Sequence, residues 1–443
     1  MDSTTLYQHI LGLRTPWTVS RVDMQMSLEE IHVYVDHAAD SRFSCPKCKR
    51  ELAIYDHTPE RTWRHLDTCQ LKTFLHARAP RVQCPDHKTL MASLPWAEPG
   101  SGFTALFERL AIDLLLAMPA ARAGGILRVS PDQLSRIKAK AVQRGLVRRE
   151  LAKSAGKHPV FEHGCVDEKS WKKGRCFGTI IGNVGAGIVE DVYEGRAGGG
   201  LASFYDSMTK KARSAILSMS QDFHAGYSNV TVDKLDQGKD VVVFDPFHLM
   251  MHVNEAVQTT HRSELAQSRR IFEKGKDKRL ASAAGLAALH AERKIKKLVG
   301  SKWSLVRGRE NQTDKQREQL SWLEDCSHYD SAEAWRLKEK LRSMWRVCAD
   351  VEEAEKWLKD WCSEVRSGLV LAMKKVANMV EKHAWGILNG FRMKLSNSPA
   401  ETINSKIQAI RAKARGHKSF AAFKNDVLFH LGALDLYPRA VNA

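Results

Sequence analysis

Two short knuckles of metal-binding residues constrain the N-terminal part of this chain more than any other feature of its sequence. Cys45-Pro-Lys-Cys48 has the spacing C-x-x-C, and Cys84-Pro-Asp-His87 repeats that spacing with a histidine in the last position. Four sulfur and nitrogen ligands arranged in this way fit a tetrahedral structural zinc site that has no open coordination position. We therefore expect Zn²⁺ to stabilise a small zinc-binding β domain over residues 1–98, whose own apolar core is thin.

The segment between the knuckles is longer than in a short zinc ribbon, and it contains three spare candidate ligands: His57, His65 and Cys69. Two alternatives to zinc remain. In the first, the knuckles are unrelated turns with buried thiols. In the second, Cys45 and Cys48 are a redox-active pair, although no thioredoxin-like βαβ pattern surrounds them. The five cysteines that follow position 84 are scattered without motif spacing, which is typical of reduced thiols in a cytoplasmic protein.

The net charge indicates a polyanionic partner. Lysine and arginine number 69 against 51 aspartates and glutamates, which gives a formal charge of +18. Such a balance favours nucleic acid or an anionic membrane surface. The longest apolar runs, such as residues 110–121, are interrupted or too short to span a bilayer, and the N-terminus lacks the features of a secretion signal. A membrane protein or a secreted protein is therefore disfavoured.

A helix-turn-helix is expected within residues 99–155. Its first helix would end near Leu127, and its second would begin at Pro131 with Ser130 as the N-cap. The second helix carries the kinds of side chain that a recognition helix needs to reach base edges and phosphates: Gln133, Ser135, Arg136, Lys138 and Lys140. Any small bundle of three helices gives a similar pattern, so the assignment to DNA reading depends also on the positive charge and on the adjacent zinc module.

Residues 160–255 follow the order β-β-β-α-β-α-β, and acidic residues end two of the strands. The first strand ends in Asp167, a helix is expected over residues 201–211, and the fourth strand, residues 216–222, ends in Asp222. Three strands, a helix and a fourth strand are the order of a ribonuclease-H-like α/β core, in which the ends of the first and fourth strands are neighbours. We therefore expect Asp167 and Asp222 to lie side by side.

Two adjacent carboxylates repel each other unless a cation neutralises them, and Mg²⁺ prefers such oxygen ligands. A third carboxylate from a late helix would complete a two-metal site for phosphodiester chemistry. Glu401 is our candidate, because it heads an amphipathic segment that becomes basic. The simpler interpretation is that each of these acids is an ordinary turn or cap residue.

An all-helical insertion is expected to interrupt this core. The core would occupy residues 156–258 and 386–443, and the insertion would occupy residues 259–385. Basic runs in the insertion favour contacts with backbone phosphates over a merely solvated face. Tryptophans recur through it, and most should pack inside it. Trp303, which has a basic context, is the one best suited to stack on a base unpaired during strand cleavage.

Together these motifs resemble one family, the bacterial insertion-sequence transposases of the ISL3 type, which carry a DDE catalytic domain. The resemblance covers nearly the whole chain. Besides the knuckles, it rests on Val-Asp-Glu-Lys-Ser-Trp at 166–171 and on residues 244–257, 302–323, 334–342 and 396–416. The sequence departs from the usual pattern at His87, which replaces a cysteine, and beside Glu401, where a glycine is often found.

The resemblance implies Asp167 as the first catalytic acid and Glu401 as the third. Two candidates remain for the second, because Asp222 ends the fourth expected strand and Asp245 ends the next one. We favour Asp222, since the fourth strand neighbours the first. Asp245-Pro-Phe-His248 then resembles the D-x-x-H element that related transposases carry downstream of the second acid. His248 would be an accessory residue near the scissile phosphate, and a half-buried structural histidine is the alternative.

The resemblance also implies the activity. Such enzymes bind the terminal inverted repeats of their element as double-stranded DNA, cut the ends and join them to target DNA, using two Mg²⁺ or Mn²⁺ ions. Lys406 and Arg411, which follow Glu401, would contact the DNA. Two ends must be held together, so a homodimer or higher oligomer is expected, in the bacterial cytoplasm at the nucleoid. The alternatives are a catalytically inactive DNA-binding regulator and a related nuclease that cuts without strand transfer.

Overall fold

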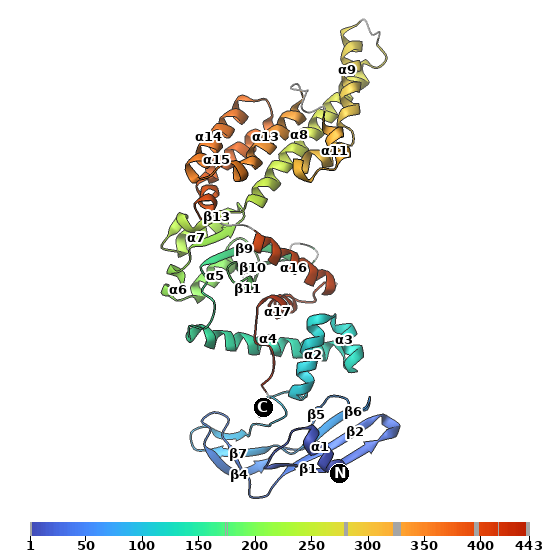
Figure 1. Ribbon diagram of the computed structural model, residues 1–443, viewed down its shortest axis with the longest axis vertical. Coiled ribbons are helices and arrows are strands. Elements are labelled where there is room, and N and C mark those ends of the chain that lie inside the picture. Colours follow the sequence, from blue (N-terminus) through green and yellow to red (C-terminus); the bar gives the residue numbers. More distant parts are fainter. Residues whose placement is uncertain are drawn as a thin grey trace. The chain divides into compact units, whose positions relative to one another are not determined.

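The computed structural model describes residues 2–172, 174, 176–278, 282–321, 329–393, 398–414 and 416–439. Its internal contacts divide the chain into two compact units, which Figure 1 shows with their helices and strands. The first unit comprises Met1–His158 and Ala412–Ala443, and the second comprises Pro159–Arg411. The segment 386–443, expected as the last part of the core, is therefore divided between the units.

The first unit begins with helix α1 (Ser3–Ile10) and two four-stranded sheets. One sheet has the order β1-β2-β6-β5, with strands Trp17–Gln25, Glu30–His37, Lys72–Ala77 and Arg61–Arg64. The other has the order β3-β4-β7-β8, with strands Arg42–Ser44, Glu51–His57, Pro80–Cys84 and Lys88–Met91. Buried side chains of both sheets form one apolar core, in which Trp96 meets Trp17 and Trp63 edge to face at 4.8 and 5.7 Å.

The helices of the first unit follow the sheets. They are α2 (Ala105–Ala117), α3 (Ala120–Leu127), α4 (Pro131–Ser154) and α17 (Phe420–Leu431), which packs against α4 (Figure 1). Helix α3 ends at Leu127 as expected, and α4 begins at Pro131. The Ser130 hydroxyl accepts a hydrogen bond from the backbone N–H of Gln133, whose side chain accepts one from the backbone N–H of Ser130. This capping box fixes the start of α4.

The second unit contains a five-stranded mixed sheet of order β11-β10-β9-β12-β13. Its strands are β9 (His163–Lys172), β10 (Cys176–Asn183), β11 (Ile188–Glu194), β12 (Ser218–Gln221) and β13 (Val242–Phe244). β10 is antiparallel to both of its neighbours, β9 and β11, whereas β12 runs parallel to both β9 and β13. Helices α5 (Gly199–Ser207), α6 (Lys210–Ser214) and α7 (Ala225–Lys234) connect these strands, and α5 and α7 share a buried apolar core with the sheet.

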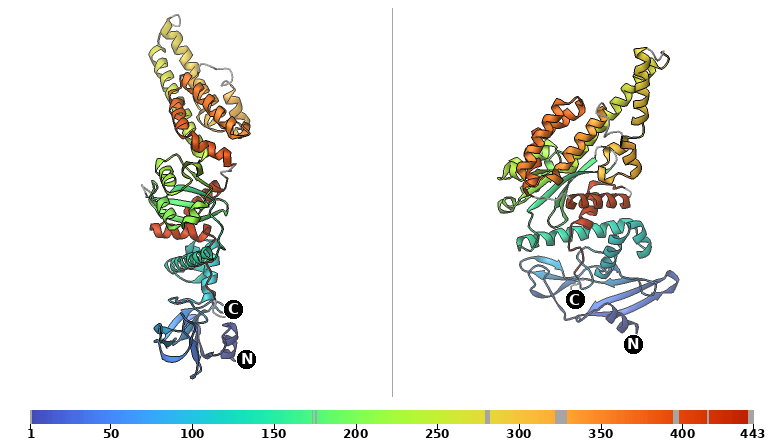
Figure 2. Two further views of the ribbon diagram at one scale, coloured as in Figure 1. Left: turned by 90° about the vertical axis from the view of Figure 1, so that its left-hand side faces the viewer. Right: turned by 45° about the horizontal axis from the view of Figure 1, so that its top comes forward.

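A large helical part follows β13. Its helices are α8 (Pro246–Gly275), α9 (Ala283–Leu298), α10 (Lys302–Val306), α11 (Asp314–Leu320), α13 (Asp330–Val347), α14 (Val351–Ser367), α15 (Leu371–Met393) and α16 (Ser398–Ala414). Short 3-10 turns lie at Met26–Leu28, Gly238–Val241 and Arg309–Asn311. Helices α8 and α9 form a long hairpin, which both views of Figure 2 show. Trp335 and Trp361 are buried among these helices, as expected for most tryptophans of the insertion, and Trp322 lies outside the described residues.

Candidate functional site

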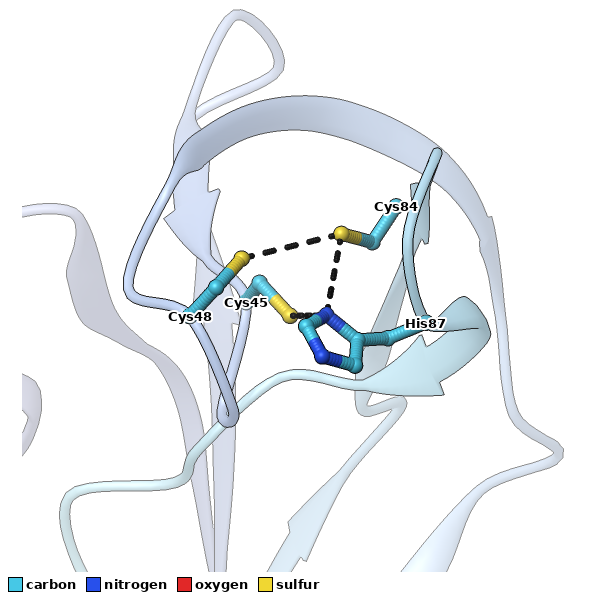
Figure 3. A group of neighbouring side chains, drawn as sticks. All are labelled: Cys45, Cys48, Cys84 and His87. Atoms are coloured by element: carbon cyan, nitrogen blue, oxygen red, sulfur yellow. Dashed lines mark hydrogen bonds between the residues drawn. The ribbon is translucent and has the colours of Figure 1, made fainter.

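The four knuckle residues converge on one point. Each knuckle is the turn of a hairpin, one between β3 and β4 and the other between β7 and β8, and β4 pairs with β7. Figure 3 shows the four side chains of Cys45, Cys48, Cys84 and His87 turned toward one another, and their ligand atoms all lie within 4.8 Å of each other. The closest contacts join Cys84 Sγ to His87 Nδ1 at 3.4 Å and Cys48 Sγ to Cys84 Sγ at 3.7 Å.

The donor set of this cluster fits Zn²⁺. Three sulfurs and one imidazole nitrogen approach a common centre, as a closed structural zinc site requires. Backbone hydrogen bonding, chiefly from the N–H of Cys48, lowers the pKa of Cys45 to about 6, so its thiolate form is favoured at neutral pH. The residues after each knuckle, Lys49 and Lys88, are left-handed with φ of 64° and 62°, which closes the two turns in the same way.

The three spare candidate ligands, His57, His65 and Cys69, do not join the cluster. His65 is buried and its Nδ1 lies 2.9 Å from the Thr104 hydroxyl, while His57 stacks on His37 with 5.1 Å between the ring centroids. Cys69 is exposed. Among the described residues, the knuckle cluster is the only group of three or more histidine, cysteine or acidic side chains placed to share one metal.

Three aspartates form a row across the parallel strands β9, β12 and β13. Asp222 and Asp245 directly follow β12 and β13, but β9 continues to Lys172, so the expectation that the first strand ends in Asp167 is wrong and Asp167 lies in the middle of that strand. β12 pairs with β9 through Ser220 and Cys165, and two further positions place Asp222 beside Asp167. β12 pairs with β13 through Gln221 and Phe244, and one further position places Asp245 on the other side of Asp222. Because neighbouring strands lie about 4.8 Å apart, Asp222 is one strand spacing from each of the other two acids.

This row faces a cavity of about 20 Å³, which is lined by Asp167, Asp222, Asp245 and His248 together with Ile403 and Asn404 of α16. Helix α16 therefore covers the face of the sheet from which the acids project. Glu401 lies in α16 two residues before Ile403, and its side chain is outside the described residues. The cavity is electrostatically negative. Burial, together with the charges of Asp167 and Asp245, raises the pKa of the Cys165 thiol to about 12.

Each acid of the row has a different set of partners. Asp167 forms an ion pair with Lys169, with 2.8 Å between Nζ and Oδ2. Asp222 Oδ1 accepts a hydrogen bond from the backbone N–H of His224 at 2.9 Å. Asp245 is the N-cap of α8, since its Oδ1 accepts from the N–H of Phe247 at 2.7 Å, and its Oδ2 lies 3.8 Å from His248 Nε2.

The expected DNA-reading side chains of α4 differ in their availability. Arg136 is exposed and makes no hydrogen bond or ion pair with any residue that the structure describes. Lys140 is exposed and donates to the carbonyl of Gly100 at 2.6 Å. The Gln133 side chain completes the capping box, the Ser135 hydroxyl donates to the carbonyl of Pro131, and Lys138 forms an ion pair with Asp426 of α17.

The remaining candidate contacts lie in the second unit. Trp303 exposes 66% of its surface, and the ammonium group of Lys302 lies 4.8 Å from its ring centroid. Lys406 is exposed and Arg411 is partly exposed on α16. Lys169 and Asn404 were not among the candidates. The sequence carried a signal for each. Side chains alternate along a strand, so Lys169 lies on the same face of β9 as Asp167, and residues three apart share one side of a helix, as Glu401 and Asn404 do.

Comparison with known proteins shows the family to which this chain belongs. The family model of ISL3 transposases matches residues 165–427, so the chain belongs to this transposase family. Two further family models match the N-terminal part: the zinc finger of the transposases IS204/IS1001/IS1096/IS1165 at residues 41–87, and the helix-turn-helix domain of ISL3 transposases at residues 92–141. The chain is thus a transposase with a zinc finger and a DNA-binding helix-turn-helix.

Two curated relatives support the assignment. The transposase for insertion sequence element IS1557 from Mycobacterium tuberculosis, in the strains CDC 1551 / Oshkosh and H37Rv, is 24% identical over 436 residues. This similarity covers 95% of the chain and 93% of each relative. No solved structure matches the chain. None of the described helices combines the length and apolarity needed to cross a membrane.

Proposed function

We propose that this transposase cleaves the ends of an insertion sequence and joins them to target DNA by two-metal phosphoryl transfer. The observation that carries the proposal is the register of β9 and β12, which sets Asp167 and Asp222 side by side beneath α16, the helix of Glu401. The sheet order and strand directions support a ribonuclease-H-like core. In this proposal the core comprises residues 156–258 and 386–443, the helical insertion 259–385, and the DNA-binding modules 1–98 and 99–155.

Asp222 is a better second acid than Asp245. Asp222 and Asp167 lie on adjacent strands, whereas Asp245 and Asp167 are separated by β12 and thus by about 9.6 Å, two strand spacings. One oxygen of Asp245 is also committed to capping α8, while no described residue donates to Oδ2 of Asp222. Two carboxylates that share a metal must lie close together, and the pair Asp167–Asp222 meets this requirement.

The residues of the row fit Mg²⁺ or Mn²⁺ by their chemistry, because they offer hard carboxylate oxygens in an anionic cavity. When bound by Asp167, Asp222 and Glu401, two such ions would stabilise the attacking and leaving oxygens of the phosphodiester. His248 lines the same cavity, which supports an accessory role for it near the scissile phosphate. Lys169, paired with Asp167, balances part of the negative charge of the row.

DNA binding is proposed for both units. The zinc and helix-turn-helix modules would bind the terminal inverted repeats, with Arg136 as the α4 candidate that has no partner among the described residues. Exposed Lys406 and partly exposed Arg411 of α16 would contact backbone phosphates, and exposed Trp303 would stack on an unpaired base. Since two ends must be cut and joined together, the active form would be a homodimer or a larger assembly.

The test is a cleavage and strand-transfer assay with Mg²⁺ on DNA from the ends of the element. We expect Asp167→Ala, Asp222→Ala and Glu401→Ala each to abolish both products. Asp233→Ala, which removes an exposed acid from α7, should leave both products unchanged. Intact activity in the three variants would overturn the site. Cleavage without joining would favour a nuclease, and DNA binding without cleavage by the unaltered protein would favour a regulator.

A further inference from the structure

A basic pocket in the first unit is not accounted for by the zinc cluster or by the exposed face of α4. Its volume is about 600 Å³. Its walls come from β5, β6, the loop 100–103, the residues after α3 and the first turns of α4. Five basic side chains line it: Arg64, Lys72, Arg128, Arg136 and Lys140.

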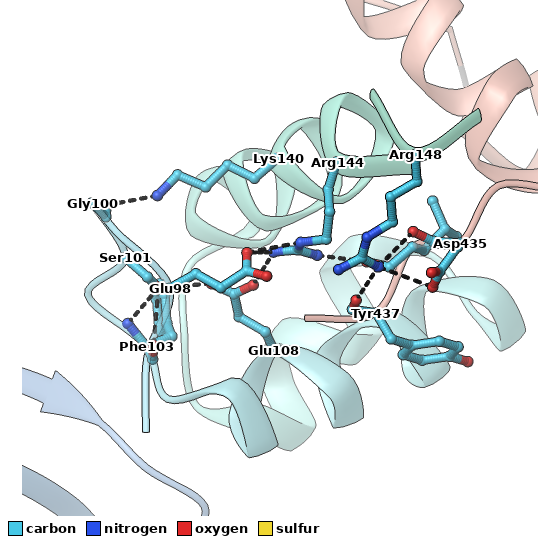
Figure 4. Close-up of polar contacts among 11 residues, drawn as sticks. Glu98, Gly100, Ser101, Phe103, Glu108, Lys140, Arg144, Arg148, Asp435 and Tyr437 are labelled. Atoms are coloured by element: carbon cyan, nitrogen blue, oxygen red, sulfur yellow. Dashed lines mark hydrogen bonds and ion pairs between the residues drawn. The ribbon is translucent and has the colours of Figure 1, made fainter. Parts of the chain in front are cut away.

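The acids in and around the pocket leave part of this positive charge uncompensated. Among the described residues that line it, the only acid is Glu108. Its carboxylate accepts a hydrogen bond from the Ser101 hydroxyl at 2.6 Å and pairs with Arg144 at 2.8 Å, as Figure 4 shows. Because Arg144 already neutralises Glu108, an anionic ligand would meet an excess of positive charge.

The five cations divide into two groups. Arg64 and Arg128 both form ion pairs with Asp67 and therefore hold the walls together. Lys72 lies 3.8 Å from Glu30. By contrast, Lys140 has only the carbonyl of Gly100 as a partner (Figure 4), and Arg136 has none among the described residues. Two exposed cations are thus available to bind a phosphate.

Aromatic rings complete the pocket. Phe103 and Phe74 line it, and both are only half-buried. Phe103 stacks on Phe107 with 5.0 Å between centroids and an interplanar angle of 18°, which fixes the orientation of its ring. A bare phosphate would need neither a volume of about 600 Å³ nor aromatic rings. A nucleotide would use both, since its base stacks on aromatic side chains while its phosphate binds cations.

We propose that this pocket accepts one unpaired nucleotide of the bound DNA, with its phosphate on Arg136 and Lys140 and its base against Phe103. The inference rests on the proposed function, because the nucleotide belongs to the DNA that α4 binds. Taking a base out of a duplex costs free energy, so DNA that already has an unpaired nucleotide is the better ligand.

The experiment measures fluorescence anisotropy with the full-length protein and two labelled duplexes from the end of the element. One duplex is fully paired, and the other carries a short single-stranded overhang. We expect about tenfold tighter binding of the overhang duplex, as one stacked base would provide. Phe103→Ala should lose this preference and retain binding of the paired duplex, whereas Lys140→Gln should lose the preference and also weaken binding of the paired duplex. Tyr55→Ala, at a ring that is 58% exposed outside the pocket, and Arg14→Ala should keep it.

The outcomes separate this inference from the proposed function. Failure of the unaltered protein to bind either duplex would contradict DNA binding itself. Equal affinity for the two duplexes, or a preference that survives in both Phe103→Ala and Lys140→Gln, would overturn the pocket inference alone. Competition by excess dTMP that removes the preference supports a nucleotide as the occupant. Binding of dTMP without any overhang preference would assign the pocket to a free nucleotide instead and would also overturn it.

Discussion

Replacing Asp222 by asparagine should stabilise this protein while abolishing its activity. Asp222 stands between Asp167 and Asp245, one strand spacing from each. Two unit charges about 5 Å apart repel by about 3 kcal/mol at an effective dielectric constant of about 20. Lys169 neutralises part of the charge of Asp167, and Asp222 is only half-buried, so water screens part of the rest. We therefore expect Asp222→Asn to raise the free energy of unfolding by roughly 1–2 kcal/mol.

The assay is urea unfolding, monitored by circular dichroism in buffer without Mg²⁺. The buffer contains no chelator, because a chelator would also remove the structural zinc. Asp233→Asn is the matched control, because it removes the same charge from an exposed position on α7. Excess Mg²⁺ should stabilise the unaltered protein and not Asp222→Asn, since a ligand that binds the folded state shifts the equilibrium. The reasoning is refuted if Asp222→Asn is destabilising, or if Mg²⁺ stabilises both proteins equally.

Three further predictions concern other parts of the chain. Cys84→Ser should lower the bound zinc from one ion per chain to none and lower the thermal midpoint, measured by metal analysis and calorimetry. Gly386→Ala should cost about 1–3 kcal/mol in urea unfolding, because its Cβ would lie 2.4 Å from the Phe244 ring, whereas Gly390→Ala, with 3.5 Å to its nearest neighbour, should cost nothing. Burial lowers the pKa of His65 to about 4, so its contribution to stability is present above about pH 6.5 and is lost as pH falls toward 4. The free energy of unfolding should therefore fall by roughly 2 kcal/mol between pH 7 and about 5 because of His65, and His65→Gln should lack this part of the fall.

The parts of the fold that local chemistry controls were predictable. The start of α4 followed from Ser130 and Pro131, because a cap and a proline at the first helical position act within a few residues. The fourth strand was expected at residues 216–222 and lies at Ser218–Gln221. One helix was expected over residues 201–211, but two are found, since the Thr209 hydroxyl accepts from the N–H of Ala212 and starts α6. Thr209 is a residue type that caps helices, but the amphipathic pattern of residues 201–211 outweighed it in the prediction.

The candidate site could be predicted only in part. The order of strands and helices was enough to place Asp167 beside Asp222, because the topology fixes which strands are neighbours. Sequence alone could not show that Lys138 is paired with Asp426, since that contact depends on how α17 packs against α4. The basic pocket was equally hidden, because it joins Lys72 of β6 to Arg136 of α4 across separate elements.

The central claim is that Asp167, Asp222 and Glu401 together hold the catalytic ions. The most direct test is anomalous diffraction from crystals of the protein with end DNA and Mn²⁺. The account predicts Mn²⁺ peaks at coordination distance, about 2.0–2.2 Å, from carboxylate oxygens of all three residues. Peaks bound by Asp245 in place of Asp222, or no peak between Asp167 and Asp222, would contradict it.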